Sequence, residues 1–188
     1  RQKEKSGDNP VFYQYLGSTL ENLDRPDEAY EVYEKAMASF PGEGYFPWRL
    51  SVLLKDRGNE AELPTARTLI EKAIEINPDN YNYRFAAGQL YKQLGEWEEA
   101  RKQYVYLVER NESSAFYQNE YGVLLCEVGE FTEAIPVFKE AIRLNDAMPL
   151  YYQNMANAYV AMGDEEHAAE TFEKASQLEM ELSPAGRN

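Results

Sequence analysis

The sequence is poor in the residues that usually build disulfides, metal sites and catalytic centres, because it contains only one cysteine and one histidine. The lone Cys126 cannot form an intrachain disulfide, and the lone His167 cannot supply the ligands of a typical zinc site. The sequence also has no Gly-rich loop of the kind that cradles phosphate groups. We therefore expect no bound metal and no cofactor.

Positive charge is scarce as well. The chain carries 33 Asp and Glu residues against 19 Lys and Arg residues, which gives a formal net charge of −14. Because phosphate backbones and anionic membrane surfaces repel such a polyanion, we expect no nucleic-acid partner. No apolar run approaches the roughly 18 residues that a membrane-spanning helix needs, so we also expect no membrane insertion.

An initiator methionine and a signal-peptide pattern are both missing, so we expect the chain to be a fragment of a longer protein. A single cysteine is compatible with both reducing and oxidising compartments. The localisation therefore stays open between the cytoplasm and the periplasm.

What the sequence does contain is an internal repeat. The motif Gly-Glu-Trp-Glu-Glu-Ala at 95–100 returns as Gly-Glu-Phe-Thr-Glu-Ala at 129–134 and as Gly-Asp-Glu-Glu-His-Ala at 163–168, a period of 34 residues. The same period holds earlier in the chain, apart from three extra residues that we place within 58–63. The repeat predicts an array over residues 10–182, with an N-terminal flank at 1–9 and a C-terminal tail at 183–188. Its five units are residues 10–43, 44–80, 81–114, 115–148 and 149–182.

Each unit contains two apolar runs of helical period, separated by a turn. In the last four units this turn carries a glycine: Gly58, Gly95, Gly129 or Gly163. Glycine and alanine recur in fixed columns of both runs, and large aromatic or aliphatic residues recur in others, as interlocking helices require. The pattern predicts an all-α fold, an α-solenoid of five stacked antiparallel helix-turn-helix hairpins.

These units resemble the tetratricopeptide repeat family, whose signature orders an aromatic residue, Leu-Gly, Tyr, Ala, an aromatic residue, Ala and Pro. The first unit carries the signature as Tyr13, Leu16, Gly17, Leu20, Ala29, Tyr33, Ala36 and Pro41. The third carries it as Gly88, Tyr91, Gly95, Trp97, Ala100 and Tyr104. Departures occur at the first aromatic position, which holds Pro47, Arg84 and Gln118 in the middle units. The resemblance implies a right-handed superhelix in which the first helix of each unit lines an inner ligand groove.

Residues spaced i, i+3, i+7 and i+10 share one face of a helix, so this spacing selects the groove face of each first helix. Aromatic residues on that face are candidate anchors, and its amides can pair with the backbone of an extended peptide. The candidate partner-binding residues are Gln14, Ser18, Trp48, Val52, Lys55, Phe85, Gln89, Lys92, Phe116, Asn119, Val123, Gln153 and Asn157.

Charge varies along the array, because the five units carry formal charges of −5, −1, 0, −4 and −6. Lys55 and Lys92 occupy equivalent groove positions, with Arg49 and Arg84 nearby, so an acidic group is expected to bind in the second and third units. Tetratricopeptide co-chaperones hold the carboxylate terminus of heat-shock proteins with a basic clamp. The equivalent positions here supply no such basic set, so that role is not expected.

No residue pattern indicates catalysis, because His167 is expected to be exposed and Cys126 has no basic neighbour to activate its thiol. We predict a non-catalytic protein–protein interaction scaffold that binds a segment of a protein or peptide partner in the groove. Two alternatives stay open: a module of an envelope polysaccharide export or synthesis complex, and the regulatory arm of a larger enzyme. Since no capping helix follows residue 182, we expect further repeats or self-association at the C-terminal end.

Overall fold

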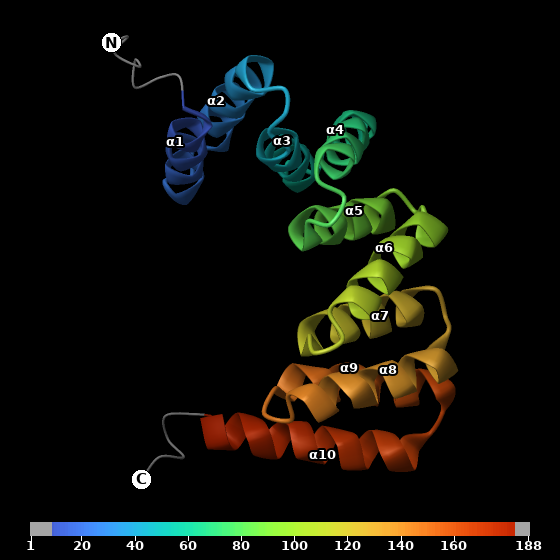
Figure 1. Cartoon of the computed structure of the whole chain (residues 1–188). Helices are drawn as coiled ribbons and strands as arrows, with labels where there is room; N and C mark the ends of the chain where they lie inside the picture. Colours follow the sequence, from blue (N-terminus) through green and yellow to red (C-terminus); the bar gives the residue numbers. More distant parts are fainter. Residues whose placement is uncertain (1–8, 183–188) are drawn as a thin grey trace. The chain divides into compact units, whose positions relative to one another are not determined.

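The computed structural model describes residues 9–182, which form ten α-helices, one short 3-10 helix and no β-strand (Figure 1). The all-α prediction is therefore confirmed. The predicted flank up to residue 8 and the tail at 183–188 lie outside the described residues. The helices are α1 (Pro10–Asn22), α2 (Pro26–Ser39), α3 (Tyr45–Asp56), η1 (Glu60–Glu62), α4 (Leu63–Ile76), α5 (Tyr81–Gln93), α6 (Trp97–Arg110), α7 (Ala115–Glu127), α8 (Phe131–Leu144), α9 (Pro149–Met162) and α10 (Glu165–Leu182).

Each repeat predicted from the sequence encloses two of these α-helices, and we call the earlier one its first helix. The first helices are thus α1, α3, α5, α7 and α9. The three extra residues of the second repeat are accommodated by η1, between α3 and α4. Residues at the turn have positive φ in every repeat: Asp24 in the first and Gly58, Gly95, Gly129 and Gly163 in the others. Aspartate is one of the few residues besides glycine that adopt this left-handed conformation, because its side chain is short and polar.

The starts of several first helices are fixed by side chains or proline. Asn80 Oδ1 accepts hydrogen bonds from the backbone N–H groups of Asn82 (3.0 Å) and Tyr83 (3.3 Å) at the start of α5. Ser114 Oγ accepts from a backbone N–H at the start of α7, and Pro149 occupies the first turn of α9. These residues satisfy or remove N–H groups that have no partner within the helix.

Small residues bring the two helices of a hairpin together. A Cβ placed on Gly17 of α1 would lie 2.1 Å from the Tyr33 ring of α2, and one on Gly122 of α7 would lie 2.6 Å from the Phe138 ring of α8. Alanine columns on the second helices are fully buried, as Ala66 and Ala100 show. The small columns seen in the sequence are therefore sites of close helix approach.

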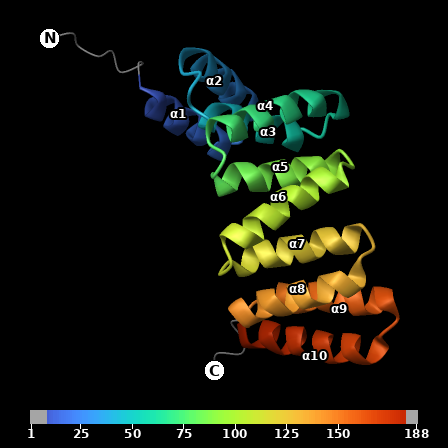
Figure 2. The same cartoon turned by 45° about the vertical axis from the view of Figure 1, so that its right-hand side comes forward.

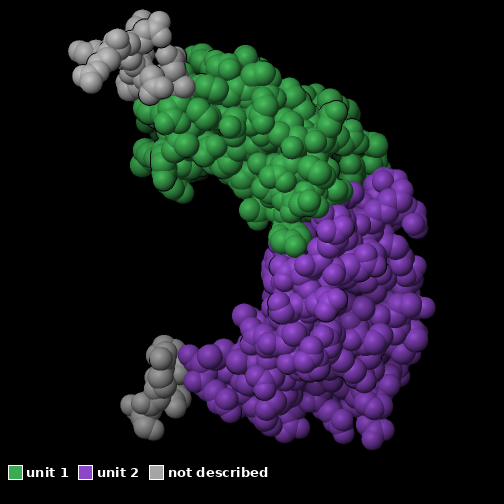
Figure 3. Space-filling model, in the orientation of Figure 1, with its two compact units in different colours: residues 1–96 green, residues 97–188 purple. Residues whose placement is uncertain are grey.

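The chain divides into two compact units, residues 1–96 and 97–188, and Figure 3 colours them separately. The division falls between α5 and α6, inside the third repeat. Within residues 1–96, α1 to α5 pack in chain order, and α3 also contacts α5. Within residues 97–188, α6 to α10 pack in chain order, and α7 also contacts α9. First helices of consecutive repeats thus meet inside each unit.

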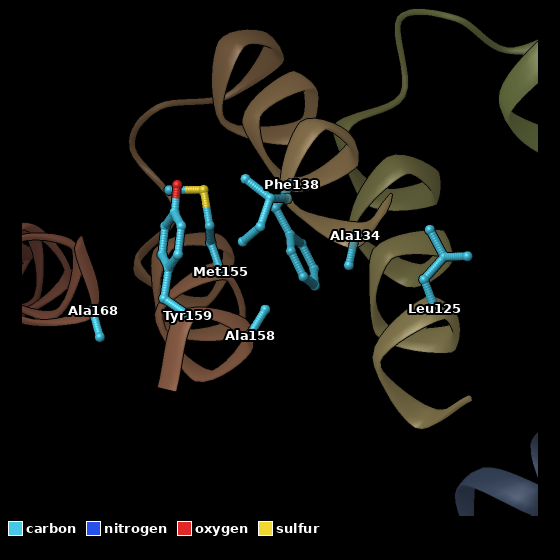
Figure 4. Packing of buried hydrophobic residues seen from close by; sticks show 8 residues of the cluster. Leu125, Ala134, Phe138, Met155, Ala158, Tyr159 and Ala168 are labelled. Carbon is cyan, nitrogen blue, oxygen red and sulfur yellow. The ribbon is translucent and has the colours of Figure 1, made fainter. Parts of the chain in front are cut away.

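Each unit has its own hydrophobic core. In residues 1–96, Tyr33, Phe46 and Leu50 are almost completely buried in one cluster. In residues 97–188, Phe138 is buried between α7 and α9, together with Met155 and Tyr159 of α9 (Figure 4). Figure 2 shows α9 next to α10, and α9 packs against α7 and α8 as well. These cores hold the first helices in place, so they position the candidate site. The right-handed superhelix stays a prediction.

Candidate partner-binding surface

Most of the predicted partner-binding residues lie at the surface without being fully exposed. Phe116 is 45% exposed and Asn157 is also exposed, whereas Asn119 is only 1% exposed. The half-buried members are Gln14, Ser18, Trp48, Val52, Lys55, Phe85, Gln89, Lys92, Val123 and Gln153. Half-burial is typical of side chains that fill the seams between adjacent helices while keeping one edge accessible.

Trp48 of α3 is the centre of an aromatic cluster in residues 1–96. Its ring lies 5.5 Å from Tyr45 in an edge-on arrangement and 5.4 Å from Tyr83 of α5, centroid to centroid. The Arg49 guanidinium lies over the same indole, 5.0 Å from its centroid. The indole Nε1 is buried and has no hydrogen-bond partner within residues 9–182. The cluster therefore fixes the ring, and a partner can contact the accessible part of the ring but not its buried N–H.

A hollow of about 140 Å³ lies beside this cluster, between α1 and α3, the first helices of consecutive repeats. Two of the predicted residues, Ser18 and Trp48, are among those that line it. The lining residues are Ser18, Glu21, Asn22, Tyr45, Trp48 and Arg49.

The charges of this hollow are paired with each other. Arg49 binds the Glu21 carboxylate through two nitrogens, with Nε 3.2 Å from Oε1. Tyr33 donates a hydrogen bond of 2.6 Å to the same carboxylate, and burial together with this bond raises the pKa of Tyr33 above its ordinary value. Arg49 is therefore already neutralised by the chain's own carboxylate.

The other cations expected to hold an acidic group also have intramolecular contacts. Lys55 Nζ lies 3.1 Å from Asp56 Oδ1 and 3.4 Å from Gln89 Oε1, so two predicted residues from consecutive first helices meet here. Arg84 Nε donates to the Pro78 carbonyl at 2.9 Å. Binding of an acidic group at these repeats thus stays a prediction, and such a group would have to compete with these contacts.

A larger hollow, of about 280 Å³, lies in residues 97–188 and is lined by residues of α7, α8 and α9. Val123 and Asn157 are predicted partner-binding residues that line it, and Phe138 and Ala158 of the buried cluster in Figure 4 line it as well. The complete lining is Val123, Cys126, Glu127, Phe131, Phe138, Asn154, Asn157 and Ala158. Its walls are mainly apolar, with two amides and one carboxylate.

The amides do not form the accessible series that the sequence suggested. Asn119 is buried, and its Oδ1 accepts a 2.8 Å hydrogen bond from Asn154 Nδ2 of the next first helix. Gln153 Nε2 donates to Glu179 Oε1 of α10 at 2.6 Å. We therefore correct the role expected for Asn119, because a side chain so deeply buried stabilises the contact of α7 with α9 and is not accessible to a partner.

Asn154 was missed by the sequence interpretation although it lines the larger hollow. The spacing used to select groove residues placed Gln153 on the groove face and omitted the next residue, Asn154. The sequence did contain one signal of this contact: Asn119 and Asn154 are 35 residues apart, one more than the repeat. Equivalent positions are 34 apart, so an amide pair at 35 suggests contact between consecutive first helices.

The structure describes both residues that were considered for catalysis, His167 and Cys126. His167 is exposed, and its Nδ1 lies 2.8 Å from Asp164 Oδ2, so this carboxylate raises the pKa of the imidazole. Burial, followed by the charge of Glu127, raises the pKa of the Cys126 thiol, which disfavours the reactive thiolate. Within residues 9–182, no group of three or more His, Cys, Asp or Glu side chains is arranged to hold a metal ion.

The helices of the described chain include none that is both long and apolar enough to cross a membrane.

Comparison with known proteins identifies related repeats along most of the chain. Family models described as "Tetratricopeptide repeat" match residues 53–108 and 85–149, and residues 12–42 and 150–179. No curated protein matches the chain.

Solved structures share the fold over almost the whole chain. "MamA MSR-1 C2" has 25% sequence identity and a TM-score of 0.75, over 93% of this chain and 98% of that one. "MamA 41-end from Desulfovibrio magneticus RS-1" has 17% identity and a TM-score of 0.83, over 95% and 99% of the two chains. YrrB, described as "a TPR protein with an unusual peptide-binding site", has 18% identity and a TM-score of 0.74, over 95% and 91%.

Proposed function

The chain belongs to the tetratricopeptide repeat family, whose members include protein-interaction scaffolds, and from this premise we propose that it is a non-catalytic scaffold. It binds a segment of a partner protein on the surfaces formed by its first helices. The proposal applies to each compact unit separately, because each presents such a surface.

One observation carries the proposal: both hollows lie where first helices of consecutive repeats meet, and both include residues selected for partner binding. In residues 1–96 the hollow contains Ser18 and Trp48, and in residues 97–188 it contains Val123 and Asn157. Concave sites with apolar walls and a few polar groups are where protein surfaces commonly bind ligands. The peptide-binding site of YrrB, a protein of the same fold, adds a precedent.

Trp48 and Phe85 are the strongest anchor candidates in residues 1–96, because both are half-buried aromatic side chains on first helices. The Tyr45 and Tyr83 rings hold Trp48 in place, so little side-chain freedom is lost on binding.

The test begins with affinity capture by the intact chain and identification of the bound protein. The purified binding segment is then titrated against the wild type and the Trp48→Ala/Phe85→Ala double variant. We expect the double variant to bind at least about a hundredfold more weakly, because anchor residues typically contribute 2 kcal/mol or more each.

Trp97→Ala is the matched control, because Trp97 is 40% exposed but lies on α6, a second helix. This variant should bind the segment as the wild type does. Circular dichroism and thermal unfolding of both variants establish that any loss of binding is not a loss of folding. Equal affinity of the double variant and the wild type would exclude Trp48 and Phe85 as anchors.

A further inference from the structure

The hollow bounded by α7, α8 and α9 differs from the smaller one in size and chemistry. Its volume is about 280 Å³, twice that of the hollow beside Trp48, and Val123, Phe131, Phe138 and Ala158 give it apolar walls. Asn154 and Asn157 of α9 supply amide groups on one side. The hollow therefore combines an apolar interior with groups able to hydrogen-bond a polypeptide backbone.

The volume limits what this hollow can bind. Sites for drug-sized ligands and cofactors usually occupy about 300–1,000 Å³, so about 280 Å³ lies just below this range. One large aliphatic or aromatic side chain is therefore a better match than a complete cofactor. A side chain in such a site covers the apolar walls and excludes water from them, which is the usual environment of a binding hot spot.

The charge of the surrounding repeats identifies the chemistry of the chain that would carry this side chain. Residues 115–182 contain thirteen Asp and Glu against three Lys and Arg, a formal charge of −10. One of the three cations, Arg143, is already bound through two nitrogens to Glu140, at 2.7 and 2.8 Å. Glu127 lies in the wall of the hollow itself. An acidic segment would be repelled here, and a basic one attracted.

We propose that this hollow is an anchor pocket for a single apolar side chain, of the size of Leu, Met or Phe, carried by a basic segment of a partner protein. The proposal deepens the proposed function and depends on it. The apolar side chain enters the pocket, Lys or Arg residues beside it face the acidic repeats, and the segment's backbone lies along Asn157 and Asn154. Because Asn154 Nδ2 already donates to Asn119, its Oδ1 is the atom left to accept a backbone N–H.

Occupancy of the pocket can be measured through Cys126, because this residue lies in the pocket wall and is the only cysteine in the sequence. A maleimide attached to Cys126 would fill part of the pocket in protein that is already folded. A bound side chain would in turn cover the thiol and slow its alkylation. Both effects can be followed in the folded wild-type chain, without any substitution.

The experiment selects binders from a random peptide library with the intact chain as the target. We expect selected peptides to share one Leu, Ile, Met or Phe beside Lys or Arg. Replacing that apolar residue by Ala should weaken binding at least tenfold, and alkylating Cys126 with N-ethylmaleimide should do the same. The same peptides should slow Cys126 alkylation at least severalfold, and raised salt should weaken their binding.

The control is Cys126→Ala protein, whose affinity is measured with and without the same reagent, and the reagent should leave that affinity unchanged. Peptides that bind equally well after alkylation of Cys126, or that share acidic residues, would overturn the pocket proposal and leave the proposed function standing. Peptides whose binding is lost only in the Trp48→Ala/Phe85→Ala variant would do the same. If no peptide is selected at all, the proposed function fails together with the pocket.

Discussion

At the scale of single residues, glycine sets the distance between the helices of a hairpin. A Cβ on Gly122 would meet three ring carbons of Phe138 at 2.6, 2.8 and 2.9 Å. Phe138 is fully buried, so its ring has little room to move. Gly122→Ala should therefore lower the free energy of unfolding by about 1–3 kcal/mol, although alanine alone favours a helix by about 0.5–1 kcal/mol.

Chemical denaturation of Gly122→Ala measures this effect, and Gly42→Ala provides the matched control. A Cβ on Gly42 would meet nothing within 4 Å, so that substitution should leave stability close to that of the wild type. Equal stability of the two variants would show that the α7–α8 contact adjusts easily to an added methyl group.

The pair formed by His167 and Asp164 predicts a pH dependence at the start of α10. The hydrogen bond to Asp164, and then its charge, raise the pKa of His167, while the same hydrogen bond lowers the pKa of Asp164. The stabilisation due to His167 is complete below its unfolded pKa and is lost as the pH rises through the folded value. The stabilisation due to Asp164 is present above its unfolded pKa and is lost as the pH falls through the folded value.

NMR titration of the single imidazole gives the pKa of His167 directly. We expect a value above that of an unfolded control peptide, and Asp164→Asn should lower it toward the peptide value. Glu173→Gln, a change at an exposed carboxylate on the same helix, should have little effect. An unshifted His167 in the wild type would contradict the pairing.

At the scale of helices, a partly buried ion pair connects the first repeat to the second. Glu21 of α1 accepts hydrogen bonds from Arg49 of α3 and from Tyr33 of α2. The side chains of Glu21 and Arg49 are only 17% and 21% exposed. Removal of the Glu21 carboxylate therefore leaves partly buried hydrogen-bond donors without their acceptor. Glu21→Ala should lower the free energy of unfolding by about 1–3 kcal/mol.

Glu28→Ala is the control for this prediction, because Glu28 pairs with Arg25 within one hairpin and both side chains are at least half exposed. Exposed pairs of this kind contribute little, so the variant should unfold as the wild type does. A loss of stability that is equally small for Glu21→Ala would mean that the link between α1 and α3 is not energetically important.

Helices and their packing columns were predictable from the sequence, and the accessibility of individual groove residues was not. The 34-residue period locates Gly122 opposite Phe138 because both belong to columns that recur in every repeat. Burial of Asn119 depends on Asn154, which one repeat carries and the others do not. A repeat pattern describes what the units share, so it does not reveal a contact that occurs in only one of them. The hollow lined by Cys126 depends in the same way on local side-chain sizes at three helices.

At the scale of the whole molecule, stability in a repeat array comes from contacts between neighbouring helices. Interior helices have neighbours on several sides, as α3 has with α2, α4 and α5. The helix at the start of the array has fewer: α1 buries Gly17 and Leu20, whereas α3 buries six residues. Large side chains of α1 remain accessible, among them Phe12 at 47% and Tyr15 at 70% exposure.

This difference predicts a gradient of amide hydrogen exchange, because a helix with few buried contacts opens locally at a lower free energy. Amides of α1 should exchange at least about tenfold faster than those of α3, equivalent to about 1.4 kcal/mol in opening free energy. Exchange measured by mass spectrometry on the intact chain resolves the two helices. The Trp48→Ala variant serves as a comparison, because loss of that ring should speed exchange in α3 while α1 keeps its rate. If α1 exchanged as slowly as α3 in the isolated chain, something beyond its contacts with α2 and α3 would have to protect it. A second copy of the chain that covers its accessible apolar side chains would then be detectable as a concentration-dependent exchange rate.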